Sequence, residues 1–368
     1  MRDRSIDVSR GLLVLAMVYG HVLQFFADTQ IFPLADVLMD VINLTVFPTF
    51  VFCFGATAVL AYLKKPYKKA LPGMVKTTLR TLCTFWASGI AYRVLRENKP
   101  FAVGTVRRVL QLKDIPGWSE FLISFALYAA LIIVAFPLLR YLMKRPWALA
   151  AAAAVSFLSC FAVDYDAVQS VHLALLIGGR QFSFFPIVQY MPYFFAGMAY
   201  AGCAGKTRIA LAILSVLASG AGVYDWIAGG GFPRRFPPEW GWIALPAALV
   251  CAVVLMSKLL LLGKDRRVRF VLEPICTFLS HFGSRSLYYL LGSNLILFTM
   301  AGKGIVPMLS PRSVLPWTMP IQSPQGAVIW TAVMLAALWF AALLAGRSAP
   351  KTPAAPKGYA LTPEQKNG

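Results

Sequence analysis

RGLLVLAMVYGH, residues 10–21, is an apolar stretch that begins with an arginine and ends with a histidine. His21 follows Arg10 by eleven positions, which at about 100° per residue brings both side chains onto one face of a helix. At about 1.5 Å of rise per residue, they lie roughly 16 Å apart along the axis. An ionisable residue at membrane depth is costly and marks a functional site by default. The stretch therefore predicts a transmembrane helix with a fixed cation near one membrane surface and an imidazole, which exchanges protons near neutral pH, deep inside.

The whole chain has the composition of a polytopic membrane protein. Of its 368 residues, 58% are hydrophobic and 14% are charged, whereas about a quarter of the residues of a soluble domain are charged. The mean hydropathy is +0.66. The net charge of +20 comes mainly from short connections between apolar runs, so we interpret it chiefly as a topology signal and not as a nucleic-acid footprint. The cysteines and histidines show no spacing typical of a metal site.

Ten apolar runs of membrane-spanning length alternate with connections of different charge. Basic residues gather near 64–76, 140–145, 206–208 and 258–269, and the positive-inside rule places these connections in the cytoplasm. We therefore expect an all-α polytopic membrane protein, a bundle of about ten transmembrane helices with both the N and the C terminus in the cytoplasm. The expected spans lie near 11–27, 41–62, 77–95, 119–139, 147–163, 185–203, 208–228, 241–261, 284–301 and 327–346.

Two segments stand apart from this pattern. The connection 93–117 should be external, yet it is basic. Either the third span is misplaced, or this connection folds back as a cationic surface over a site, and we favour the second interpretation. The segment 347–368 is rich in Pro, Ala and Lys, which predicts a disordered cytoplasmic tail without catalytic residues.

The opening RSIDVSRGLLVLAMVYGH, residues 4–21, resembles the first helix of the acyltransferase-3 family of integral-membrane acyltransferases, which carries an Arg, ten residues and then a His. The resemblance makes residues 1–346 a transmembrane acyltransferase domain. The family often has an Arg-x-x-Arg at the start of its third helix. Here Thr77 takes the first position and Arg80 the second, and Lys76 can substitute as a point charge. More diffuse matches are VFCFGATAVLAYLKKP, LISFALYAALIIVAFPLL, FFPIVQYMPYFFAGMAYAG and FGSRSLYYLL.

The resemblance implies a multi-pass enzyme of a bacterial inner or plasma membrane that transfers an acyl group, usually acetyl. The donor would be cytoplasmic acetyl-CoA or another acyl-CoA, used as a co-substrate. The acceptor would be a hydroxyl of a cell-envelope polysaccharide or lipid-linked glycan. It implies no permanently bound cofactor, no metal and no nucleic-acid partner.

The residues suit such a probable O-acetyltransferase. An alcohol needs a base to remove its proton, and His21 is the expected catalytic base. The phosphates of the donor need fixed cations, for which Arg10, Lys76 and Arg80 are expected because they fall near cytoplasmic helix ends.

Four further polar residues are candidates for support or acceptor binding. Asp7 could orient Arg10 or act as an acid at the start of a helix. Gln24 lies one turn past His21 and could fix the imidazole tautomer, or it could be an interfacial polar residue. Trp118 and Glu120 begin the fourth span, where the carboxylate could bind an acceptor hydroxyl or simply reach toward water.

Two other functions remain open. A transporter or flippase for an anionic or saccharide ligand would also need a polar inner face and a histidine at mid-membrane, although the sequence has no recognisable inverted repeat. A non-catalytic assembly partner would account for the missing arginine at position 77.

Overall fold

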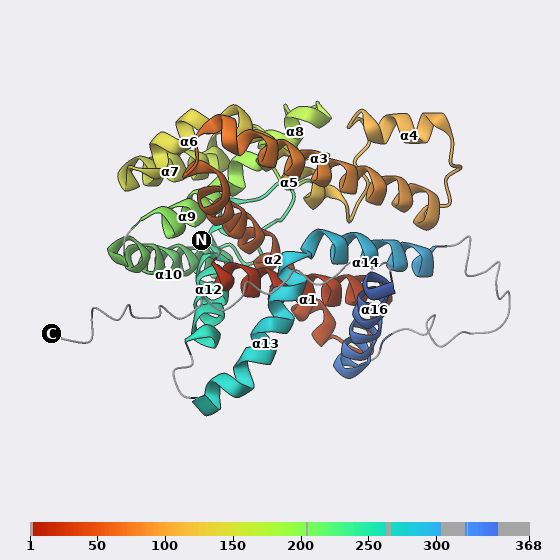
Figure 1. The fold of residues 1–368 in the computed structure, drawn as a ribbon. Helices are drawn as coiled ribbons and strands as arrows, with labels where there is room; N and C mark the ends of the chain where they lie inside the picture. The colour runs from red at the N-terminus through yellow and green to blue at the C-terminus, as the bar shows by residue number, and fades with distance from the viewer. Residues whose placement is uncertain (1–2, 204, 263–265, 303–320, 322, 345–368) are drawn as a thin grey trace, which may run out of the picture.

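The computed structural model describes the chain except for residues 1–2, 204, 263–265, 303–320, 322 and 345–368, and for the side chains of 266–269. The predicted tail at 347–368 therefore lies outside the described residues. The described part consists of helices and their connections and has no strand, only an isolated backbone bridge between Ala27 and Ile321. The all-α class is confirmed (Figure 1). The helices are α1 Arg4–Phe26, α2 Leu34–Ala58, η1 Val59–Leu63, α3 Tyr67–Ala91, η2 Tyr92–Arg96, α4 Val103–Leu110, α5 Glu120–Val134, α6 Phe136–Met143, α7 Pro146–Ala162, α8 Val171–Ile177, α9 Ile187–Gly202, α10 Gly205–Ala228, α11 Trp240–Ala244, α12 Ala247–Leu261, α13 Arg266–Ser284, α14 Ser286–Ala301 and α16 Pro324–Leu344.

Several of these helices are long and apolar enough to cross a membrane. Among the described residues there are five, or six if the bent pair α5–α6 counts as one span. Helix α10 illustrates their surroundings, because it buries only Ser219 and Gly222 and exposes a row of large apolar side chains. Water would oppose such exposure, whereas lipid favours it. The protein is therefore a membrane protein, and the remaining predicted spans correspond to shorter, bent or more charged helices such as α7, α9 and α3.

Helix α1 occupies the middle of the bundle and contacts α2, α12, α13, α14 and α16. It begins at a capped end, where the Asp3 carboxylate accepts a hydrogen bond from the Ser5 backbone N–H at 2.9 Å. Glycines let α13 approach closely: a Cβ on Gly11 or Gly283 would collide with a backbone carbonyl of the other helix. Such small-residue crossings are typical of helices packed in a membrane. This packing buries most of α1, including the region around its histidine.

Two interruptions shape the space beside α1. Helices α5 and α6 meet at an angle of 84°, and Pro137 stands at the start of α6, where its missing N–H does no harm. Helices α13 and α14 are separated at Arg285, whose φ and ψ of −119° and 23° leave the helical range. A new helix N-terminus therefore begins at Ser286, inside the bundle and next to α1.

Candidate active site: two cavities along helix α1

One cavity, called here the Arg10 cavity, has a volume of about 260 Å³ and is rich in cations. Arg10, Arg80 and Arg285 all line it, from α1, from α3 and from the break between α13 and α14. The Arg10 Nη2 donates a hydrogen bond to the Ser286 Oγ at 2.7 Å. The wall also carries hydroxyl groups from Thr57, Tyr62, Thr77, Thr81, Ser284 and Ser286. Guanidinium and hydroxyl donors in one cavity suit a ligand with phosphate oxygens.

The three candidate positions on α3, residues 76, 77 and 80, are placed differently relative to this cavity. Arg80 lines it, whereas Lys76 is exposed on α3 and is not among its lining residues. Thr77, which stands where the family has an arginine, also lines the cavity, and its hydroxyl lies 2.8 Å from the Tyr62 hydroxyl. Asp7 is buried on α1, where α13 packs closely against its backbone carbonyl at Gly283.

The second cavity, called here the His21 cavity, has a volume of about 350 Å³. His21, Glu120 and Arg235 line it together with Phe47, Phe121, Phe125, Phe185 and Trp118. Three polar atoms, the His21 Nδ1, the Glu120 Oε2 and the Arg235 Nε, are shielded from solvent and have no hydrogen-bond partner in the described structure. Buried polar atoms normally have partners. A base, an acid and a cation with unused hydrogen-bonding capacity, set among aromatic rings, suit a small polar ligand.

Trp118 is held in a strained conformation at the edge of the His21 cavity. Its φ of 57° is in the left-handed region, which costs a bulky residue about 1–3 kcal/mol unless its surroundings fix it. Two amides do so: the Trp118 Nε1 donates to the Gln24 Oε1 at 2.8 Å, and the Asn294 Nδ2 donates to the Trp118 carbonyl at 3.1 Å. The Gln24 amide also donates to Asn43, at 3.3 Å. Gln24 therefore positions Trp118, and its described hydrogen bonds do not include His21.

The connection 93–117 packs back against the bundle and buries Val109, and two of its six basic residues form ion pairs within it. Arg93 pairs with both Asp114 and Glu97, and Lys99 pairs with Glu97 at 3.0 Å. Its end, at Gly117, lines the His21 cavity, whereas none of its basic side chains does. The connection stays basic, with six basic residues against Glu97 and Asp114, but it contributes only its end, Gly117, to the lining of the His21 cavity, followed by Trp118. The cationic surface over the site stays a prediction.

The cation of the His21 cavity comes instead from a connection that the sequence did not single out. Arg235 lies between α10 and α11, and its guanidinium carbon is 4.7 Å and 4.6 Å from the ring centres of Phe185 and Phe236. Burial lowers the pKa of Arg235 relative to an exposed arginine, while Glu120 opposes this shift. An arginine nevertheless keeps its charge.

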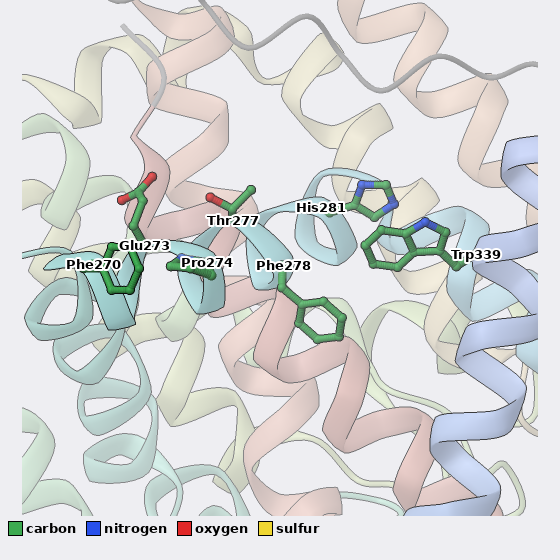
Figure 2. Close-up of a pocket in the computed structure, with 7 residues that line it drawn as sticks. All are labelled: Phe270, Glu273, Pro274, Thr277, Phe278, His281 and Trp339. Atoms are coloured by element: carbon green, nitrogen blue, oxygen red, sulfur yellow. The ribbon is translucent and has the colours of Figure 1, made fainter. Parts of the chain in front are cut away.

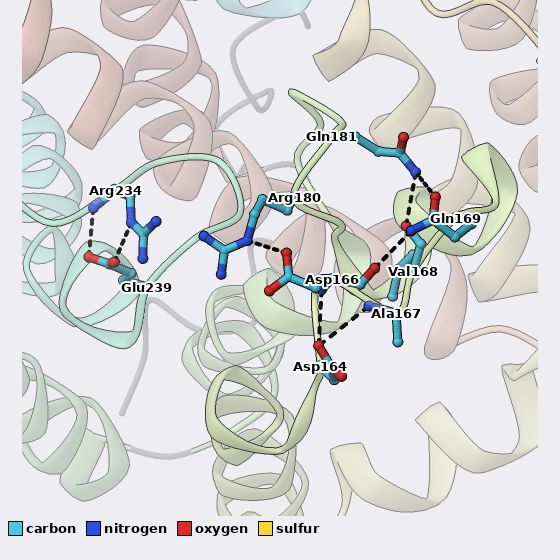
Figure 3. A network of polar contacts seen from close by, with 9 residues as sticks. All are labelled: Asp164, Asp166, Ala167, Val168, Gln169, Arg180, Gln181, Arg234 and Glu239. Atoms are coloured by element: carbon cyan, nitrogen blue, oxygen red, sulfur yellow. Dashed lines mark hydrogen bonds and ion pairs between the residues drawn. The ribbon is translucent and has the colours of Figure 1, made fainter.

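Two connections that contribute residues to the cavity contain polar contacts next to those residues, and Figure 3 shows the contacts of Arg234 and of Arg180. In one, the Glu239 carboxylate accepts bonds from the Arg234 backbone N–H at 2.9 Å and from its Nε at 2.6 Å. In the other, Arg180 pairs with Asp166. Ser183 and Phe185, which follow Arg180, reach the His21 cavity beside Arg235. Both ion pairs are exposed and stabilise these connections little by themselves, so this wall depends mainly on the buried ring of Phe185 and on the contact of Arg235 with it.

The two cavities adjoin at two aromatic side chains. Phe50 and Phe125 line both the Arg10 cavity and the His21 cavity. Their rings contact each other edge to face, with centres 5.9 Å apart. Helix α1 runs along both cavities, so Arg10 and His21 line two neighbouring cavities that share Phe50 and Phe125.

Most of the predicted site residues thus come together, but not as one cluster. Arg10 and Arg80 line one cavity, and His21, Gln24, Trp118 and Glu120 line the other. Sequence reasoning missed Arg235 and Arg285. A signal for the second existed, since Arg285 lies inside the late fragment FGSRSLYYLL. Within the described residues, no group of three or more His, Cys, Asp or Glu side chains could hold a metal ion.

Comparisons with protein-family models, with curated proteins and with solved structures gave no match to this chain. The functional argument therefore rests on the two cavities and on the chemistry of their side chains.

Proposed function

We propose that the chain is a membrane acyltransferase of the acyltransferase-3 kind, with about ten membrane passages and both termini in the cytoplasm. It moves an acyl group, most simply acetyl, from acyl-CoA to a hydroxyl of a cell-envelope saccharide or lipid-linked glycan in a bacterial inner or plasma membrane. The observation that carries this proposal is the pair of adjoining cavities along α1, one lined by arginines and the other by His21, with Phe50 and Phe125 in both linings.

In this mechanism the donor occupies the Arg10 cavity. Arg10, Arg80 and Arg285 bind the phosphates of coenzyme A, and the N-terminus of α14 at Ser286 adds backbone N–H groups of the same polarity. Tyr62 and Thr77 line the Arg10 cavity from η1 and α3, the two helices that the basic connection 64–66 joins. By the positive-inside rule this is the cytoplasmic side, where acyl-CoA is made available. The thiol arm then extends past Phe50 and Phe125 and brings the thioester to His21.

The acceptor occupies the His21 cavity from the other side. His21 removes the proton from the acceptor hydroxyl, and the oxygen attacks the thioester carbonyl carbon. The C–S bond then breaks, the acyl group stays on the acceptor oxygen, and the imidazolium returns its proton to the departing thiolate. The cation Arg235 stabilises negative charge in the cavity. Glu120 accepts hydrogen bonds from other acceptor hydroxyls, and the rings of Phe47, Phe121 and Trp118 pack on the apolar faces of a sugar.

Release of coenzyme A thiol from acetyl-CoA by purified protein in lipid vesicles tests this proposal. We expect wild-type protein to release thiol when envelope glycan extract is present, and His21→Ala to lose this activity while its melting temperature is unchanged. Equal thiol release by the two proteins would contradict the assignment of His21 as the base.

A transporter or flippase is the second candidate, because two cavities in series along one helix also describe a path for a ligand. The same vesicle assay separates the two functions. An acyltransferase consumes the thioester, whereas a transporter moves a saccharide or anion across the vesicle membrane and leaves acetyl-CoA intact.

A further inference from the structure

A third space in the molecule, called here the lateral groove, lies beside the His21 cavity and faces the lipid. It has a volume of about 790 Å³ and runs between α1, α13 and α16, with one residue from α2. Its lining is apolar almost throughout. The one threonine in it, Thr331, already donates its hydroxyl to the Ala327 carbonyl at 2.8 Å. Apart from this hydroxyl, Tyr19 and Trp339 carry the only polar side-chain atoms of the lining, so its chemistry fits a hydrocarbon chain better than a headgroup.

The lateral groove and the His21 cavity meet at a single side chain. Ile42 lines both spaces. On the facing helix, Gly20 lines the cavity and has no side chain of its own, and a Cβ there would come within 2.9 Å of Ile42. Tyr19, the residue before Gly20, lines the groove. At this point of the α1–α2 seam, only Ile42 stands between hydrocarbon and the catalytic space.

The other end of the groove opens into a second hollow between α13 and α16. Phe278 and Trp339 line both spaces, and Figure 2 shows Trp339 lying face to face with His281 at the edge of the hollow. Their ring centres are 4.5 Å apart. The hollow also includes Glu273, which pairs with Arg4 near the start of α1. A path therefore leads from the end of α1 that carries Arg4, where Glu273, Thr277 and His281 make the hollow partly polar, through the apolar groove to the seam at Ile42.

The geometry points to an amphipathic acceptor, whose hydroxyl-bearing head lies in the His21 cavity while its hydrocarbon chain passes Ile42 and lies in the lateral groove. This inference rests on the proposed acyl transfer and narrows its acceptor to a lipid-linked saccharide. Lipid chains are as apolar as the groove, so the chain gains little free energy by entering it. The groove instead orients the molecule and raises the effective concentration of the head at His21.

Bulk membrane lipid is the competing occupant of the groove, and its binding there should not depend on whether the His21 cavity is filled. The two occupants differ in one respect that can be measured. A lipid-linked saccharide binds head and chain together, so filling the cavity must release the chain from the groove. A bulk lipid responds only to changes in the groove itself.

The test uses two photoreactive probes with the same diazirine-tipped dodecyl chain, one bearing maltose and the other phosphocholine. Each is added to the full chain in phosphatidylcholine nanodiscs, and the labelled residues are identified by mass spectrometry. Ala336→Trp fills the groove, whereas Ala337→Trp, on the neighbouring exposed position outside the groove, is the matched control. Ser183→Trp fills the His21 cavity from an exposed position.

We expect the maltoside to label the groove in wild-type protein and in Ala337→Trp. Both Ala336→Trp and Ser183→Trp should lower that labelling by at least about fivefold, as expected for overfilling a space that fits its occupant. The inference is overturned if the maltoside does not label the groove, or if the phosphocholine probe labels it equally. It is also overturned if Ala336→Trp and Ala337→Trp are labelled equally, or if Ser183→Trp leaves the labelling unchanged. Thiol release from acetyl-CoA, measured on the same samples, reports separately on the proposed function, because it fails if the chain is no acyltransferase, whatever the groove holds.

Discussion

The Arg10 cavity and the His21 cavity adjoin each other along α1, yet different kinds of side chain line them. The first gathers three arginines and several hydroxyls, drawn from helix faces and from the break at Arg285. The second gathers one base, one acid and one cation among aromatic rings, mainly from α1, α2 and α5, and its cation comes from a connection. The difference teaches that α1 can serve two ligands of different charge at once. A polyanion suits the first space, and a polar molecule with a reacting hydroxyl suits the second.

The largest effect is expected from removing the base of the His21 cavity. His21→Gln keeps a polar side chain of similar reach but cannot take up a proton. Acyl transfer at saturating donor should fall by about 10²–10⁴-fold, the usual contribution of a positioned base. Turnover and the dissociation constant of coenzyme A are measured together. If coenzyme A affinity fell as much as turnover, His21 would belong to donor binding, and the two cavities would not have separate roles.

The next largest effect is expected in the Arg10 cavity, on the affinity for coenzyme A. Arg10→Ala removes a charged donor and leaves the Ser286 hydroxyl without it, so coenzyme A should bind about 10–100-fold more weakly. At saturating donor, the remaining rate should stay close to that of the wild type. Calorimetric titration with coenzyme A checks the affinity, and Arg10→Lys should recover part of it because the charge remains. An unchanged dissociation constant in Arg10→Ala would remove Arg10 from the phosphate site.

Two adjacent arginines allow the role of the cavity lining to be tested apart from that of the connection that carries it. Arg235 lines the His21 cavity, whereas Arg234 pairs with Glu239 and is exposed. Arg235→Ala should raise the acceptor concentration needed for half-maximal transfer by about tenfold, since a hydrogen bond to a charged group is lost. Arg234→Ala should change it less than about twofold, as for an exposed ion pair. Equal shifts in both variants would mean that the connection, and not the Arg235 guanidinium, sets acceptor binding.

The smallest effect concerns the third helix. Arg80 lines the Arg10 cavity but is exposed, so Arg80→Ala should weaken coenzyme A binding only about three- to tenfold, and added salt should reduce the difference. Lys76 lies outside that lining, and Lys76→Ala should leave the affinity within about twofold. These measurements sharpen the sequence prediction that treated the two cations alike. A larger effect of Lys76→Ala than of Arg80→Ala would reverse the assignment.

The sequence predicted the helical class and the region around α1 because periodicity and apolar length act locally. Arg10 and His21 lie on one helix, and helix geometry alone sets their relative direction and spacing. The predicted ten spans were harder to assess, since α5 and α6 bend by 84° and α14 is short. These features depend on how neighbouring helices pack, which no window of apolar residues encodes.

The same reason explains the residues that sequence reasoning missed. Arg235 belongs to a connection far along the chain, and it reaches the His21 cavity because that connection packs on Phe185, a residue from another part of the chain. Arg285 becomes a cavity residue because the helix breaks there. In contrast, Arg93 and Lys99 looked available in the sequence but pair with Asp114 and Glu97. Charge counting cannot distinguish a free cation from a paired one.

The most direct test of the account is a cryo-EM map of the protein bound to a thioether analogue of acetyl-CoA, which cannot transfer its acyl group. We predict phosphate density beside Arg10, Arg80 and Arg285, and an acyl end that passes Phe50 and Phe125 toward His21. Nucleotide density in the His21 cavity, or a donor whose acyl end points away from the Phe50–Phe125 wall, would contradict the division of α1 between two ligands.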